Sequence, residues 1–152
     1  MHVFVSSESE LPTELAAYRL PTAPEMIGHV MAHATLVFGE SATMVSEAAM
    51  LGVSGIYLDN TGRLYTRDLQ ERYGLCWCFT ESMADQQEAI AKAIELLSQD
   101  PATLTSDIHH GSEQLLSEKI DVTGWLVYFI EHYPQSVAET RHADAEFWKR
   151  FK

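Results

Sequence analysis

Residues 35–59 read TLVFGESATMVSEAAMLGVSGIYLD, and this stretch decides the predicted fold. Thr35–Gly39 and Ser54–Asp59 are apolar runs of the kind that form strands buried on both faces of a parallel sheet. Between them, Ser41 is a suitable N-cap for a helix, and Gly52 is suitable as its end. The stretch therefore predicts a strand, a helix and a second strand in succession.

The rest of the chain continues this alternation. His2–Ser7 and Leu75–Phe79 are further apolar runs, which brings the number of strand candidates to four. The expected helices cover residues 24–34, 67–74, 84–99, 101–119 and 121–133. Strands that alternate with helices predict an α/β domain with a Rossmann-like, three-layer parallel sheet. Four strands are few for a doubly wound sheet.

Composition excludes several classes of function. The chain has 152 residues, enough for one domain with a core, and its net charge is −12. A nucleic-acid or anionic-membrane binder needs a basic face, so we expect neither partner. No apolar run approaches the ~20 residues of a membrane span. Cys76 and Cys78 are expected to be buried thiols in a reducing compartment, and the predicted location is cytoplasmic.

The predicted helix after Thr35–Gly39 begins where α/β sheets bind ligands, beyond the carboxyl end of a strand. Its first backbone N–H groups and its dipole favour an anion such as a phosphate. Glu47 lies four residues past Thr43, about 6 Å along the axis at ~1.5 Å per residue. This offset suits a nucleotide whose diphosphate meets the helix start and whose ribose meets the carboxylate. The expected binding residues are Ser41, Ala42, Thr43, Met44 and Glu47.

The segment GESATMVSEAAMLGVSGIYLDN resembles the nucleotide-sugar-binding segment of GT-B glycosyltransferases and of non-hydrolysing UDP-N-acetylglucosamine 2-epimerases. It is most similar to an uncharacterised GT-B-like family that carries a G-D-S-G-T-M-x-x-E-A-A-x-L-G-x-P block. Further similar segments are SSESELPTELAAYRLP, PEMIGHVMAHATLVFG, LQERYGL and DVTGWLVYFIEHYPQS. Together they span residues 2 to about 137. The expected domain is therefore 1–137, followed by a helical tail over 138–152.

The resemblance is to the C-terminal domain of a GT-B protein only. It implies the nucleotide-diphosphate-sugar-binding half of a glycosyltransferase-like or 2-epimerase-like protein, truncated or completed by a separate N-terminal half. The implied substrate is a UDP-linked sugar, with no cofactor and no metal. Ser41, Thr43 and Met44 would meet the diphosphate, and Glu47 the ribose. Ala42 replaces the family's usual glycine, which predicts crowding by one methyl group. No catalytic residue is assigned, because the acceptor-binding half usually carries the base.

An aromatic stripe near the end predicts a protein partner. Trp125, Phe129 and Tyr133 repeat at helical spacing in the region where GT-B proteins cross back to their N-terminal domain. If that domain is missing, the stripe is expected to be exposed and to serve as a homodimer surface or as a contact for the missing half. The alternative function is a catalytically inactive interaction or scaffold protein that keeps the fold.

Other interpretations compete at the helix start. Glu47 is also compatible with a solvated glutamate on a helix surface. GESAT, between a strand and a helix, resembles the G-x-S-x-G nucleophile elbow of α/β-hydrolases at Ser41. Thr43 stands where that motif needs its last glycine, and no convincing Asp and His partners follow, so we favour the nucleotide site.

Two pairs of residues outside this motif have the spacing of a site. His29 and His33 are four residues apart on an expected helix, but two histidines without a third ligand are typical of a surface rather than of a metal centre. Arg63 and Arg67, after the strand Ser54–Asp59, are equally compatible with a phosphate contact and with a solvated loop.

Overall fold

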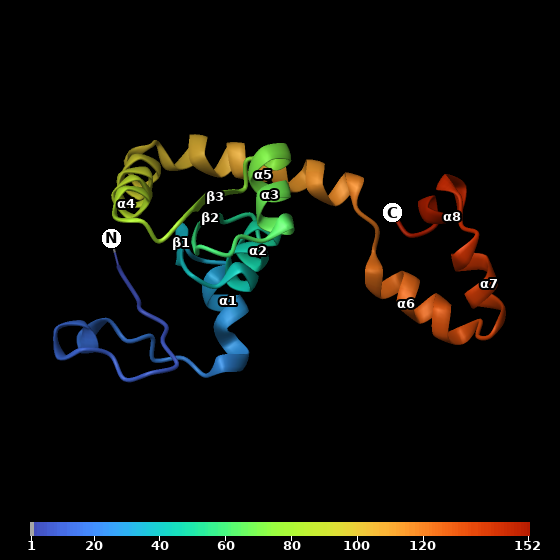
Figure 1. Cartoon of the computed structure of the whole chain (residues 1–152), viewed down its shortest axis with the longest axis horizontal. Coiled ribbons are helices and arrows are strands. Elements are labelled where there is room, and N and C mark those ends of the chain that lie inside the picture. The colour runs from blue at the N-terminus through green and yellow to red at the C-terminus, as the bar shows by residue number, and fades with distance from the viewer. Residues whose placement is uncertain (1) are drawn as a thin grey trace.

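The computed structural model describes residues 2–152. Figure 1 shows three regions: an irregular N-terminal segment, a central α/β unit, and a group of short C-terminal helices. The long helix α5 (Pro101–Glu118) leads from the α/β unit to the C-terminal helices, which extend to one side of the molecule (Figure 1). Within the described residues, no helix has the combined length and apolar character needed to cross a bilayer.

The central sheet has three parallel strands in the order β1 (Leu36–Gly39), β2 (Ser54–Leu58) and β3 (Cys76–Phe79). Strand β2 lies in the middle, and its residues from Ser54 to Tyr57 are buried. A continuous apolar run is expected for such a strand, because both of its faces are covered. The prediction of an α/β protein with a parallel sheet is confirmed.

Helices follow each strand and cover the sheet. Helix α2 (Ala42–Met50) connects β1 to β2, α3 (Leu64–Tyr73) connects β2 to β3, and α4 (Met83–Ser98) follows β3 and contacts all three strands. The approach of α2 to β2 is close, since a Cβ atom added at Gly55 would lie 2.6 Å from Val45 Cγ1.

The helix boundaries largely follow the local sequence. Ser41 caps α2 through its hydroxyl, and Gly74 ends α3 with a φ of 64°, a left-handed conformation that glycine adopts without strain. Helix α3 starts at Leu64, three residues before the expected start. The helix expected over 24–34 is shorter, a 3₁₀ turn η2 (Pro24–Met26) followed by α1 (Ile27–Met31).

The strand predicted over His2–Ser7 is wrong. Val5 forms only an isolated parallel bridge with Arg19, and its N–H donates to the Tyr18 carbonyl at 2.7 Å. The N-terminal segment therefore pairs with its own continuation, which contains the 3₁₀ helix η1 (Thr13–Tyr18). Val3 and Phe4 are at least half exposed, so this segment does not pack against the sheet, and β propensity alone leaves it irregular.

The C-terminal helices are α6 (Val122–Glu131), α7 (Gln135–Arg141) and α8 (Ala145–Lys149). Asp121 caps α6, as its carboxylate accepts from Gly124 N at 3.0 Å. An aromatic cluster holds α6 and α8 together, and its members are Trp125, Tyr128, Phe129, Phe147, Trp148 and Phe151.

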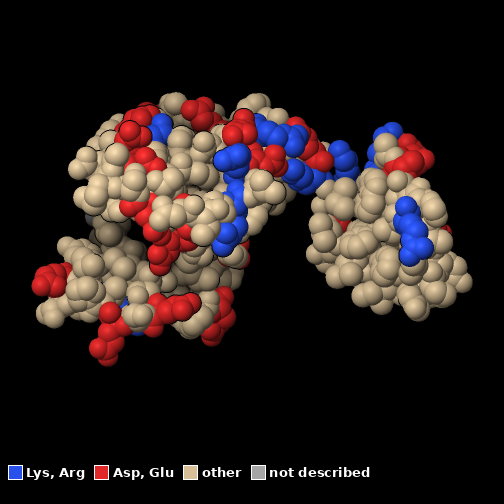
Figure 2. All heavy atoms as spheres, viewed as in Figure 1, with Lys and Arg blue, Asp and Glu red and all other residues tan. Residues whose placement is uncertain are grey.

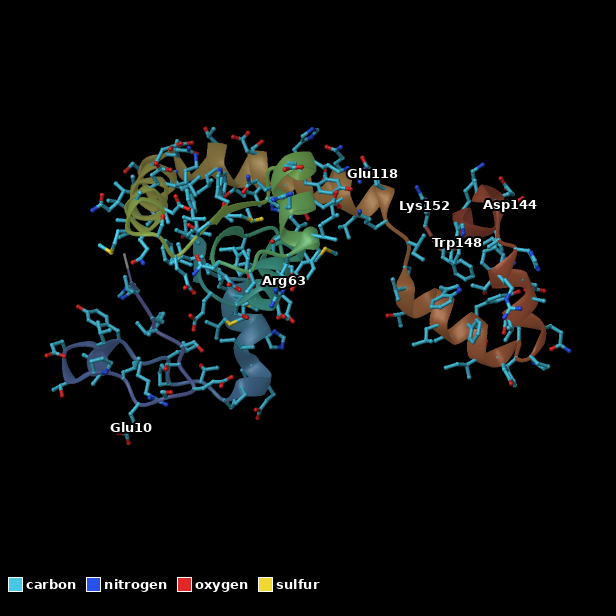
Figure 3. All side chains as sticks on the ribbon, viewed as in Figure 1. Glu10, Arg63, Glu118, Asp144, Trp148 and Lys152 are labelled. Carbon is cyan, nitrogen blue, oxygen red and sulfur yellow. The ribbon has the colours of Figure 1, made fainter. Side chains whose placement is uncertain are left out.

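This cluster corrects the prediction of an exposed aromatic stripe. The ring centroids of Trp125 and Phe129 are 5.5 Å apart, and Trp148 of α8 lies 6.2 Å from Trp125. Figure 3 shows Trp148 on the inner side of the C-terminal helices. Tyr133 alone of the three stripe residues is well exposed, at 68%. The tail partly covers Trp125 and Phe129, because packing them against other aromatic rings is more favourable than leaving them in water.

Candidate functional site

The start of α2 lies at the carboxyl edge of the sheet, directly after β1. Ser41 has an extended backbone there, and its Oγ accepts from Met44 N at 3.3 Å. The N–H groups of Ala42 and Thr43 precede the first intrahelical hydrogen bond and have no acceptor among the described residues. Met44, one of the expected binding residues, therefore offers no free backbone donor, because its N–H is already used by the cap.

The structure removes the reason to expect crowding by Ala42. Its side chain is buried and belongs to the core cluster beneath α2, together with Val45 and Ala49. The methyl group therefore occupies the interior. Thr43, the next residue, is exposed and carries a hydroxyl beside the free backbone N–H groups.

Glu47 lies one turn further along α2 and is exposed, as is Thr43. Residues four apart on a helix share a face, so the Thr43 hydroxyl and the Glu47 carboxylate are on the same side of α2. Glu47 lines a shallow, open groove of about 380 Å³ with Gly28 of α1 and Ser46, Met50 and Leu51. No hydrogen bond or ion pair joins its carboxylate to another described residue.

The loop after β2 forms a polar network at the same edge of the sheet. The Asp59 carboxylate accepts from the Tyr57 hydroxyl at 2.7 Å and from the N–H and hydroxyl of Thr61 at 2.8 Å each. These bonds, led by the Thr61 backbone N–H, hold the pKa of Asp59 at about 2. The Tyr57 pKa is raised, by burial and then by its bond to Asp59.

Two hydrogen bonds between Asn60 and Glu81 join the loops after β2 and β3. Asn60 Nδ2 donates to Glu81 Oε2 at 2.6 Å, and Glu81 N donates to Asn60 Oδ1 at 3.0 Å. Asp59, Asn60 and Glu81 are not among the site residues predicted from the sequence. One sequence feature could have predicted them: polar residues directly follow two neighbouring parallel strands, and the carboxyl ends of such strands lie at the same edge of the sheet.

The structure brings Arg63 and Arg67 to one groove at the start of α3, which is also lined by Thr61 and Cys78. Arg63 donates to Thr61 Oγ1 at 2.8 Å and to the Gly62 carbonyl at 3.0 Å. Figure 3 labels Arg63 beside the α/β unit, and Figure 2 shows basic side chains gathered over α3 and the end of α5. Both arginine side chains are exposed, so the fold is compatible with a phosphate contact and with a solvated surface.

The histidine pair gains no third ligand from the fold. Across residues 2–152, no three His, Cys, Asp or Glu side chains come together in an arrangement that would hold a metal ion. His29 is exposed on α1, and His33 is exposed in the turn that follows it.

Comparison with known proteins leaves the resemblance to GT-B proteins as an expectation from sequence motifs. No family model, no curated protein and no solved structure matches this chain. The assignment of function therefore depends on the geometry of the α2 start and on the motif residues themselves.

Proposed function

We propose that this chain binds a nucleoside-diphosphate sugar, UDP-linked in the leading case, at the start of α2. The observation that supports this most is the placement of Thr43 and Glu47 on one exposed face, beside the free N–H groups of Ala42 and Thr43. Hydrogen-bond donors for an anion and a carboxylate that can accept from a diol thus lie one helical turn apart. This separation suits a nucleoside diphosphate.

In this proposal, the diphosphate accepts from the N–H groups of Ala42 and Thr43 and from the Thr43 hydroxyl. The positive end of the α2 dipole adds to the attraction. The Glu47 carboxylate accepts from the two ribose hydroxyls. The same donors would stabilise a leaving diphosphate electrostatically during sugar transfer. The acceptor site and the catalytic base would come from a separate N-terminal half, so the chain alone is expected to bind and not to turn over.

Charge limits the expected affinity. Glu40 is exposed immediately before the α2 start, and the chain has a net charge of −12, so both repel an anionic ligand. Two backbone donors and one carboxylate in an open groove supply few contacts. We therefore expect dissociation constants on the order of 10 μM to 1 mM for UDP.

The test is a calorimetric titration of the chain with UDP and with a UDP-sugar. The wild type should bind, and Glu47→Ala should lose most of the affinity. Glu113→Ala is the matched control, because Glu113 is an exposed helix glutamate on α5. If neither nucleotide produces heat at millimolar concentration, the donor-site proposal is wrong.

An interaction protein without catalytic activity is the second candidate, and an exposed apolar face of α6 supports it. Val122, Leu126 and Ile130 follow one another at four-residue spacing and are 60%, 47% and 65% exposed. This face borders Trp125 and Phe129, because residues three apart on a helix are neighbours. Self-association that Ile130→Glu abolishes, measured by light scattering, would favour this candidate, and a monomer at all concentrations would count against self-association through α6.

A further inference from the structure

The groove at the start of α3 combines positive charge with a thiol. Its volume is about 230 Å³, and its polar lining comes from Thr61, Arg63, Thr66, Arg67 and Cys78. Ligand pockets for drug-sized molecules begin at about 300 Å³, so this groove suits a small charged group or one end of a larger molecule. The residues come from the loop after β2, the first turns of α3, and β3.

The charge of the groove is unusual in this chain. Lys and Arg number 10 against 22 Asp and Glu, yet two arginines and no acidic residue line the groove. The hydrogen-bond partners of Arg63 are neutral, the Thr61 hydroxyl and the Gly62 carbonyl. Arg67 has an exposed ion pair with Glu71, 3.8 Å from Nε to Oε1, and a pair of this kind is weak in water. Both guanidinium groups therefore retain donors for an anion.

Cys78 lines the same groove and is partly buried, whereas Cys76 is fully buried two residues earlier on β3. The neighbouring Cys76 thiol, and to a smaller extent Thr66 and Arg67, lower the pKa of Cys78 to about 7, against desolvation and Glu71, which raise it. The neighbouring Cys78, followed by burial, raises the pKa of Cys76. The Cys76 thiol donates a hydrogen bond to the Thr66 carbonyl at 3.1 Å, which favours the protonated form of Cys76, so Cys78 is the thiol of the pair that ionises more readily.

The position of Cys78 is fixed by neighbouring elements. Its backbone N–H donates to Gln70 Oε1 of α3 at 2.6 Å, which ties β3 to the helix that carries Arg67. The backbone of Cys78 therefore keeps its place beside the helix that carries Arg67. A molecule held by the arginines is presented to the sulfur.

We propose that Cys78 is a reactive thiolate and that this groove takes small, negatively charged disulfides. The negative groups of the disulfide pair with Arg63 and Arg67. The Cys78 thiolate then attacks one sulfur of the disulfide, a new S–S bond forms, and the old S–S bond breaks. The other half leaves as a thiolate that carries the bonding electron pair, so the disulfide is the oxidant and no other reactant is needed.

The mixed disulfide should persist. Resolution by the second cysteine would require Cys76 to attack as a thiolate, but Cys76 is buried and remains protonated. Same-face neighbours on a strand also make a poor disulfide pair. We therefore expect one adduct per chain, at Cys78, and no bond between Cys76 and Cys78. This inference concerns a site other than the α2 start and does not depend on nucleotide binding.

The probe is 5,5′-dithiobis(2-nitrobenzoate), an anionic aromatic disulfide, compared with 2,2′-dithiodipyridine, which is neutral. Rates are measured at pH 7 on the full chain, and peptide mass spectrometry of the wild type locates the adduct. Arg63→Gln combined with Arg67→Gln should slow the anionic probe about tenfold or more relative to the neutral probe. Arg141→Gln, an exposed arginine on α7, is the control and should change neither rate.

Three results would overturn the proposal. An adduct on Cys76 would place the reactive thiol elsewhere, and the mass spectrum reports this without any variant. An anionic-to-neutral rate ratio that the double arginine variant leaves unchanged would remove the role of the groove. Reaction with either probe only after the chain is unfolded would show that Cys78 is not accessible. Cys76→Ser should still give one adduct per chain.

Discussion

Replacing Glu47 by alanine gives the most direct test of the α2 site. The side chain is exposed and makes no hydrogen bond or ion pair with the described residues. Alanine has the highest helix propensity, so the substitution should change the free energy of unfolding by no more than about 0.5 kcal/mol. Any loss of ligand affinity can then be separated from a loss of folding.

The size of the effect follows from the contacts that are removed. A hydrogen bond to a charged group contributes about 1.5–3 kcal/mol, and the proposal assigns two of them to the ribose hydroxyls. The groove beside Glu47 is open, so water competes and the lower part of the range applies. Two bonds of about 1.5 kcal/mol each give a total loss of about 3 kcal/mol, which corresponds to a UDP affinity roughly 150-fold weaker.

Titrations with UDP, uridine and pyrophosphate distinguish the proposed ribose contact from the proposed diphosphate contact. Isothermal titration at low salt should show that Glu47→Ala weakens UDP and uridine by the same factor. Pyrophosphate, which lacks a ribose, should bind wild type and variant equally well, or slightly better to the variant because a negative charge is gone. Thermal melting checks that both proteins are folded. Equal UDP affinity in wild type and variant, or a parallel loss for pyrophosphate, would refute the assignment of Glu47 to the ribose.

Three further predictions address the fold. Gly55→Ala would place a Cβ 2.6 Å from Val45 Cγ1, and this overpacking should lower the melting temperature by about 3–10 °C. Asp59 has a folded-state pKa of about 2, below its unfolded value, so its stabilisation is present above pH ~4 and disappears as the pH falls towards 2. The melting temperatures of wild type and Asp59→Asn should therefore converge between pH 4 and pH 2, and a constant difference would contradict this. Trp148→Ala should cost about 2 kcal/mol in the C-terminal helices and shift the fluorescence of Trp125 to the red, and unchanged emission would argue against their contact.

Local sequence signals predicted the elements around the α2 site. The sequence predicted that Ser41 caps α2 and that helices end near Gly52 and Gly74. Such signals are local, because capping and chain reversal depend on a few consecutive residues. The apolar runs of β1 and β2 likewise predicted a parallel sheet. Since Ser41, Thr43 and Glu47 lie on one short helix, their relative placement required little beyond the helix itself.

Other features depended on distant parts of the chain. The run His2–Ser7 has strand-forming residues, yet it joins neither edge of the sheet, and Val5 pairs with Arg19 instead. Helical spacing placed Trp125 and Phe129 on one face of α6, but the packing of α8 decides that this face is covered.

The sequence by itself determined the alternation of strands and helices, the caps, and the spacing of the α2 site, because these follow from interactions within a turn or a strand. The tertiary structure alone brought Arg63, Arg67 and Cys78 into one groove. They lie on a loop, a helix and a strand, and the parallel pairing of β2 with β3 brings them together. The spacing of these residues in the sequence does not predict a shared site, because contacts between elements depend on how the whole sheet assembles.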